Sequence, residues 1–326
     1  MMPRPHPFAR IQNPSPWEIL KMFVGLFTLV PLRVFLIAFT VYLSCGAVLF
    51  FHYIVQSRPL TKWTLRMGCR IQLFLHGFVH IEVVGRIPAA CPPIVVSNHL
   101  SNIEILHLIT ILDEPSFVTK MSNFDIPMIG RMARDILQSV GLDRSNKSNH
   151  VTKQIVERVT NKTSSAESRP PLVIFPEGTT SNGTCLLSFK KGAFIPMQPV
   201  LPIVYTFPRS GSFIPTFESI FVSVYYWRLL SQPWNNLRCV ILSPMSPPVD
   251  SPRETAVHDY ARSVRNTMAN SLNLPLVDMN YSDKIAYHDK LRAYFSDHPR
   301  GALWAMCFEP MYQVDGDCDV IEKKSE

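Results

Sequence analysis

His99 and Glu104 are the two side chains of this 326-residue chain best suited to carry chemistry. They lie five residues apart in the stretch 94–104, where one apolar run ends at the histidine and another begins around the glutamate. A histidine whose ring is oriented by a carboxylate is a competent general base near neutral pH. The pattern therefore predicts a strand that delivers His99 to a surface and a helix that brings Glu104 back toward the imidazole.

A structural role for Glu104 accounts for the same residues. Ser101, followed three residues later by Glu104, matches a capping box, in which both side chains bond to backbone N–H groups at a helix start. In that case the carboxylate only caps the helix and His99 has no acidic partner. This motif alone leaves the two interpretations open.

A second motif favours catalysis. Phe175-Pro176-Glu177-Gly178-Thr179 follows a short apolar run and offers one acid, a hydroxyl and several backbone donors. Taken singly, Pro-Glu-Gly is an ordinary turn. The two motifs in this order indicate a shared site built where two buried strands end.

With these residues the chain resembles the glycerolipid acyltransferase superfamily, whose signature is His-x4-Asp followed by Phe-Pro-Glu-Gly. Two more blocks agree: residues 120–144, with a lysine, a Pro-x-x-Gly and a later arginine, and the Val-Leu-Pro at 200–202. Pro31-Leu-Arg33 and the stretches 189–194 and 264–269 are similar to the lysophosphatidylcholine acyltransferase branch.

The resemblance covers roughly residues 20 to 290, and two positions depart from it. Glu104 replaces the usual aspartate, and Thr180 stands where an arginine often follows Glu-Gly-Thr. The longer glutamate changes the expected geometry of the pair with His99.

The resemblance implies transfer of an acyl group from acyl-CoA to the free hydroxyl of a lysophospholipid. His99 is then the general base and Glu104 the orienting acid, with no tightly bound cofactor and no metal. The near alternative is a lysophosphatidic acid acyltransferase. An alternative of another class is a catalytically degenerate membrane scaffold, prompted by Glu104 and Thr180.

Substrate-binding roles follow from residue chemistry and from the resemblance. Arg144, with Lys120 in support, is expected to bind the acceptor phosphate, because guanidinium binds phosphate bidentately. Lys190 and Lys191 either meet the coenzyme A phosphates or form a solvated pair. Oxyanion donors are expected among backbone N–H groups near the helix start at Ser101 or in the Glu177–Thr179 loop. The acceptor glycerol site is expected to comprise Phe175, Pro176, Glu177, Gly178 and Thr179.

Composition fits a membrane-bound enzyme. Hydrophobic residues make up 47% and charged residues 17%, and the net charge is +7, which suits anionic lipid surfaces and phosphate-bearing substrates. The chain has no basic–aromatic repeat and no zinc spacing, so no nucleic-acid partner is expected. Seven scattered cysteines without a CxxC pair are expected to be reduced thiols.

An apolar segment at 22–55 contains no acid and predicts membrane insertion. Either Met22–Leu32 lies in the interface and Val34–Val55 spans, or a hairpin centred on Pro31 enters and returns. Lys323 and Lys324 resemble a dilysine signal for the endoplasmic reticulum, which requires a cytosolic C-terminus.

Alternating strand and helix patterns predict an α/β fold, a mixed twisted sheet flanked by helices, with an N-terminal membrane-embedded helical segment. The expected division is a tail and membrane segment at 1–57, an acyltransferase domain at 58–250 and a helical extension with a tail at 251–326. Strands are expected at 80–84, 94–97, 117–120, 172–175, 200–204 and 238–242, and helices at 59–78, 103–112, 127–137, 151–159 and 251–272.

Overall fold

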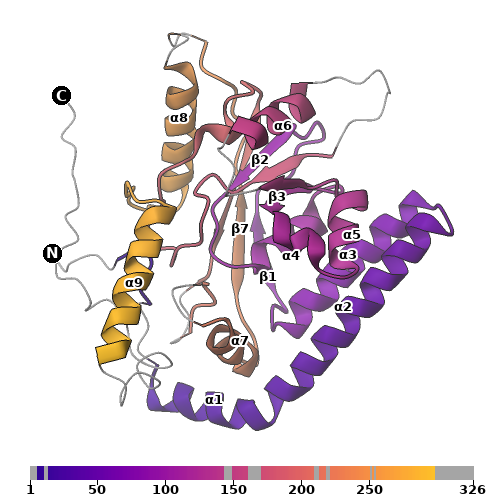
Figure 1. Ribbon diagram of the computed structural model, residues 1–326, viewed down its shortest axis with the longest axis vertical. Coiled ribbons are helices and arrows are strands. Elements are labelled where there is room, and N and C mark those ends of the chain that lie inside the picture. The colour runs from indigo at the N-terminus through magenta and orange to yellow at the C-terminus, as the bar shows by residue number, and fades with distance from the viewer. Residues whose placement is uncertain are drawn as a thin grey trace.

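A seven-stranded mixed sheet lies at the centre of the molecule (Figure 1). The computed structural model describes residues 6–10, 14–142, 149–160, 170–208, 213–217, 221–249, 252 and 255–297. The strand order is β1-β7-β6-β2-β5-β3-β4; β6 and β7 pair antiparallel and the other neighbours pair parallel. The predicted mixed α/β fold is therefore confirmed. The strands are β1 (Ile81–Val84), β2 (Ile94–Ser97), β3 (Ser116–Lys120), β4 (Val140–Leu142), β5 (Leu172–Ile174), β6 (Val200–Thr206) and β7 (Leu237–Ile241).

Helices cover both faces of the sheet because successive strand side chains point to opposite sides. Val95 of β2 packs in the core formed with α3, α4 and α7, whereas its neighbours Ile94 and Val96 pack in the core formed with α6 and α8. The sheet is thus the middle of three layers. These helices are α3 (Arg58–Leu75), α4 (Ile103–Ile111), α6 (Asn149–Thr160), α7 (Val222–Ser231) and α8 (Ala256–Ser271).

The carboxyl ends of β2, β3 and β5 meet at one edge of the sheet, because these strands run parallel. In open α/β sheets this edge is where ligands bind. The turns that leave β2 and β5 carry His99 and Glu177, so the topology brings the two sequence motifs together.

The apolar N-terminal segment forms two helices, α1 (Pro16–Phe27) and α2 (Leu29–Tyr53), which run along the bottom and right of Figure 1. Among the described residues, α2 is the helix long and apolar enough to cross a membrane, and only 11% of its most apolar window is buried. Membrane association follows from this exposed apolar surface. The Pro31 hairpin is wrong: the break falls at Thr28, and Pro31 sits in the first turn of α2, where a missing N–H costs no helical bond.

Arg33, a basic residue near the start of α2, is held by hydrogen bonds to backbone carbonyl groups. Its guanidinium donates to the carbonyl oxygens of Leu230 and Pro233, each at 2.9 Å, and also to that of Gln232. These carbonyls lie at the C-terminal end of α7, where a helix leaves its carbonyl groups unpaired and carries partial negative charge. Arg33 therefore joins α2 to the C-terminal end of α7.

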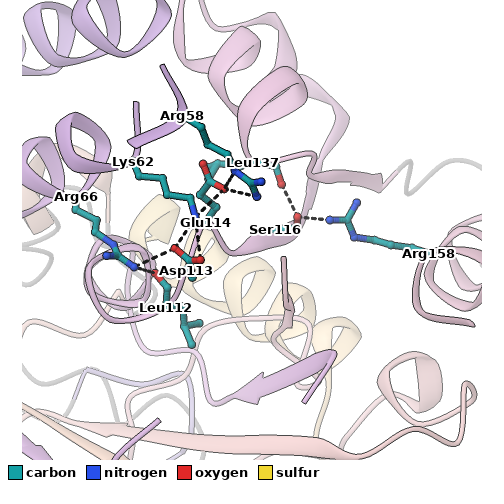
Figure 2. Close-up of polar contacts among 9 residues, drawn as sticks. All are labelled: Arg58, Lys62, Arg66, Leu112, Asp113, Glu114, Ser116, Leu137 and Arg158. Atoms are coloured by element: carbon teal, nitrogen blue, oxygen red, sulfur yellow. Dashed lines mark hydrogen bonds and ion pairs between the residues drawn. The ribbon is translucent and has the colours of Figure 1, made fainter. Parts of the chain in front are cut away.

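Basic residues on α3 are tied to the turn after α4 (Figure 2). Arg58 pairs with Glu114 at 3.1 Å, Lys62 with Asp113 at 2.9 Å and Arg66 with Asp113 at 3.2 Å. Three cations share two acids, so these basic side chains hold α3 to the turn after α4.

One predicted helix needs correction, and one short strand was not predicted. The helix expected at 127–137 is a single turn, α5 (Ile129–Arg131), followed by a π-helical turn at Met132–Ile136. The edge strand β4 was not predicted, because its three residues are too few to show alternation. A second C-terminal helix, α9 (Tyr281–Asp297), completes the described chain. The domain limits at 57 and 250 remain predictions.

Candidate active site

His99 follows β2 by two residues and lies at the carboxyl edge of the sheet. Asn98 fixes this turn, because its side chain accepts from the backbone N–H of Tyr205 at 2.7 Å and donates to the Tyr205 carbonyl at 2.9 Å. The imidazole stacks on Phe175, with ring centroids 4.2 Å apart and an interplanar angle of 21°. The two sequence motifs are therefore in direct contact.

The His99 ring is held neutral. It is half-buried, and its Nδ1 is a buried atom with no hydrogen-bond partner in the protein. Burial, with a smaller contribution from the positive charge of Lys284, lowers the pKa of His99 to about 3. A neutral imidazole with a ring nitrogen not used by the protein is the form that can accept a proton.

Glu104 does not contact the imidazole, which corrects the expected pair. Its carboxylate accepts from the backbone N–H of Leu100 at 2.6 Å and of Ser101 at 2.8 and 3.0 Å, and from the Ser101 hydroxyl at 2.9 Å. These donors lie at the start of α4, within one helical turn, and a buried carboxylate needs such bonds. The capping interpretation therefore describes Glu104 in this structure.

Glu177 bridges the two motifs. One oxygen accepts from the backbone N–H of His99 at 3.1 Å and the other from that of Leu187 at 3.0 Å. The carboxyl group is buried, which raises its pKa to about 7, while these bonds and the charges of Arg265 and Lys284 act in the opposite direction. Glu177 thus locks the end of β2 to the Glu177 loop, defined as residues 175–187.

The rest of the Glu177 loop closes onto the same turn. The Ser181 N–H donates to the His99 carbonyl at 3.1 Å, and the Gly178 N–H donates to the Phe175 carbonyl at 3.0 Å. Of the expected oxyanion donors, Ser101 and Gly178 already donate within the protein. The N–H groups of Glu177 and Thr179 remain candidate donors from that set.

The other residues predicted to bind substrate lie at different distances from His99. Lys120 is exposed at the end of β3, two strands from β2 on the same edge. The side chain of Lys190 extends over Gly178. A Cβ atom added to this glycine would lie 2.8 Å from the Lys190 Nζ. Lys191 is exposed at the start of a short 3₁₀ turn, and Arg144 lies outside the described residues. Lys190 is thus the basic residue of this set that reaches the Glu177 loop.

The sequence alone did not single out Asn98, Arg265 and Lys284. Asn98 had a local signal, a polar residue closing an apolar strand, whereas Arg265 and Lys284 reach the loop from α8 and α9. Across the part of the chain that the structure describes, no group of three or more His, Cys, Asp or Glu side chains is placed to hold a metal ion.

Known proteins are similar to this chain in sequence. A family model described as Acyltransferase matches residues 80–206. The chain is 32% identical to the lysophospholipid acyltransferase LPEAT1 of Arabidopsis thaliana over 86% of this chain and 82% of that protein. It is 30% identical to the lysophosphatidylcholine acyltransferase of Drosophila melanogaster, covering 86% of this chain and about half (54%) of that protein.

A solved structure shares the fold. The crystal structure of the 1-acyl-sn-glycerophosphate acyltransferase PlsC from Thermotoga maritima superposes with a TM-score of 0.51 at 20% identity, covering 79% of this chain and 96% of that one. The family model and the sequence relatives together show an acyltransferase domain. The chain belongs to the lysophospholipid acyltransferase family.

Proposed function

We propose that this protein is an acyl-CoA-dependent lysophospholipid O-acyltransferase that forms a phospholipid from a lysophospholipid of the lysophosphatidylcholine type. The observation that carries the proposal is the His99 imidazole. It is neutral, has a ring nitrogen without a protein partner, and stacks on Phe175 of the Phe-Pro-Glu-Gly motif. The relatives named lysophospholipid and lysophosphatidylcholine acyltransferases support the same substrate class.

His99 acts on the free hydroxyl of the acceptor. As the hydroxyl oxygen attacks the thioester carbonyl carbon, its proton moves to the imidazole; an alcohol is a poor nucleophile without such a base. The tetrahedral intermediate then collapses, the carbon–sulfur bond breaks, and the imidazolium returns the proton to the thiolate of coenzyme A. No covalent bond to the protein forms, and Glu104 acts through the backbone turn that precedes α4.

Substrate binding is assigned to basic and backbone groups around this base. We assign the acceptor phosphate to Arg144 and Lys120 and the phosphates of acyl-CoA to Lys190, with Lys191 beside it. Residues Phe175 to Thr179 shape the acceptor glycerol site. No resident cofactor is needed, because the thioester arrives already activated.

The site works at a membrane surface. The exposed apolar faces of α1 and α2 suit the bilayer in which both lipid substrate and lipid product are held. We assign the protein to the endoplasmic reticulum membrane, with its C-terminus in the cytosol.

The test is a headgroup panel. Purified full-length protein in lipid nanodiscs receives one labelled acyl-CoA and, in turn, lysophosphatidylcholine, lysophosphatidylethanolamine and lysophosphatidic acid, and products are read by mass. We expect a diacyl product with a choline-type acceptor and none from His99→Ala. Preference for lysophosphatidic acid replaces the acceptor assignment, and equal turnover by His99→Ala contradicts the proposed base. Absence of transfer to every acceptor favours the scaffold alternative.

A further inference from the structure

Two basic residues from the C-terminal helices contact the Glu177 loop. Lys284 lies on α9 and Arg265 on α8, and both are outside the residues 80–206 matched by the family model. Residues 175–187 contain no lysine or arginine of their own. In Figure 1 both helices lie on the side of the sheet away from α2. Besides Lys190, two positive charges therefore reach this loop from elements that follow the matched region.

Lys284 holds the first half of the loop. Its Nζ donates to the carbonyl oxygen of Thr180 at 2.8 Å and to the Thr180 hydroxyl at 2.7 Å. That hydroxyl donates in turn to the Phe217 carbonyl at 2.9 Å. Lys284 is only 6% exposed and its ammonium lies 5.6 Å from the centroid of Phe8. Burying an ammonium group is costly without compensating contacts, so this position is specified by the fold.

Arg265 holds the second half of the loop. Its Nη2 donates to the Leu186 carbonyl at 3.1 Å and to the Val277 carbonyl at 2.8 Å, and its Nη1 pairs with Asp278 at 3.0 Å. Leu186 precedes Leu187, whose N–H donates to Glu177. Lys284 and Arg265 therefore fix the loop on either side of the bonds that Glu177 makes.

Their charges also favour the bonding form of Glu177. Both cations oppose the rise in the pKa of Glu177 that burial causes. Each oxygen of the Glu177 carboxylate accepts one backbone N–H bond. If one oxygen carried a proton, that O–H donor would face a backbone N–H donor. Contact and charge thus act in the same direction.

We propose that Lys284 and Arg265 form a two-cation clamp, a pair of positioning residues that holds the Glu177 loop in register with His99. The clamp rests on the proposed function, and it extends the catalytic unit beyond the acyltransferase domain to α8 and α9. Neither residue needs to touch substrate, because both act through Glu177 and the loop.

The test compares matched substitutions on the same helices. Lys284→Met and Arg265→Met each remove one cation of the clamp, while Lys290→Met on α9 and Arg262→Met on α8 remove exposed charges. We expect kcat/KM per folded molecule to fall about 10- to 100-fold in the clamp variants, mainly through kcat, because small misplacement of a reacting group costs that much. The two controls keep wild-type turnover.

The pH profile separates positioning from simple stabilisation. The groups that set it are Glu177, which is influenced by Arg265 and Lys284, and His99, which is influenced by Lys284. Loss of a cation makes it easier for these groups to bind a proton, so their pKa rises. The acid limb of kcat/KM then moves to higher pH in both clamp variants. Lys284→Arg keeps the charge and keeps the limb in place.

The outcomes are distinct. Clamp variants with wild-type turnover per folded molecule and an unmoved acid limb overturn the clamp, even if their melting temperatures fall. Should one variant fail to accumulate, the other decides, because Lys284 and Arg265 hold the same loop. A wild-type protein that transfers no acyl group overturns the proposed function and the clamp together, whereas an active wild type with unaffected variants overturns the clamp alone.

Discussion

Glu104 and Glu177 are chemically alike and do different work. Both are buried, burial raises the pKa of each to about 7, and both use their two oxygens to accept backbone N–H bonds. The partners of Glu104 lie three and four residues away, whereas those of Glu177 lie 78 and 10 residues away. A local cap forms with its helix, but a long-range bridge exists only once the sheet has assembled. Glu177 therefore governs the geometry of the site and Glu104 the start of α4.

The largest effect is expected from His99→Ala. The variant keeps the backbone N–H that donates to Glu177, so the bridge persists while the base is lost. We expect turnover to fall about 100- to 10,000-fold with little change in melting temperature. The control is His107→Gln on α4, whose buried Nδ1 lies 2.9 Å from the Tyr205 hydroxyl and away from the proposed chemistry. A large loss of turnover in His107→Gln would show that the assay reports folding rather than the base.

Glu177→Gln comes next, because it breaks the bridge between the motifs. An amide offers one oxygen, so its NH2 group must face the N–H of either His99 or Leu187. Leaving a buried donor unsatisfied costs about 1–3 kcal/mol. We expect a lower melting temperature and a clear loss of kcat, measured by thermal unfolding in detergent and by labelled acyl transfer. Wild-type values for both would mean that the bridge does not hold the site.

Glu104 and Glu177 each have a raised pKa, which predicts how the stability of the protein depends on pH. Each carboxyl group has a pKa of about 7 in the folded protein against 4.5 ordinarily, so the native state binds more protons between these values. Each group's contribution to stability therefore falls as pH rises from 4.5 to 7, by up to about 1.4 kcal/mol per pH unit.

Glu104→Gln and Glu177→Gln should each remove one glutamate's contribution to this fall in stability. The two contributions should be similar in size. The measurement is urea unfolding of wild type and both variants across this pH range. A decline that persists unchanged in one variant would show that its glutamate does not titrate in this window.

The smallest effect is expected from Glu104→Gln on activity. The amide oxygen can keep the bonds from the Leu100 and Ser101 N–H groups, and the NH2 group can donate to the Ser101 hydroxyl, which accepts as readily as it donates. We expect turnover within about threefold of wild type, because the variant keeps the helix cap. A loss as large as that of Glu177→Gln would restore Glu104 as the acid that orients His99.

Much of the fold was readable from the sequence. The strand at 94–97 is β2 as expected, and the helix at 103–112 matches α4 to within one residue, because buried strands and apolar helices leave clear periodic patterns. The predictions fail where the sequence pattern is short or where the helix is irregular. β4 has three residues, and the segment after Arg131 winds as a π-helix that periodicity does not distinguish.

The sequence predicts a candidate base and a candidate loop but not the contacts that connect them. His99 and Phe175–Thr179 follow from motif chemistry. The sequence offered two partners for Glu104, the imidazole and the helix start, and had no means to choose between them. Hydrogen-bond distance decides that choice, and four short bonds at the helix start satisfy the carboxylate.

The sequence by itself determined the α/β class, the apolar helix near the N-terminus and the residue types able to transfer an acyl group. These properties depend on local order along the chain, where periodicity and motif spacing are visible. Only the tertiary structure decided that Glu177 binds the His99 backbone and that Arg265 and Lys284 hold the same loop. Such contacts join segments distant in sequence, and folding specifies them through burial and strand order rather than through any local pattern.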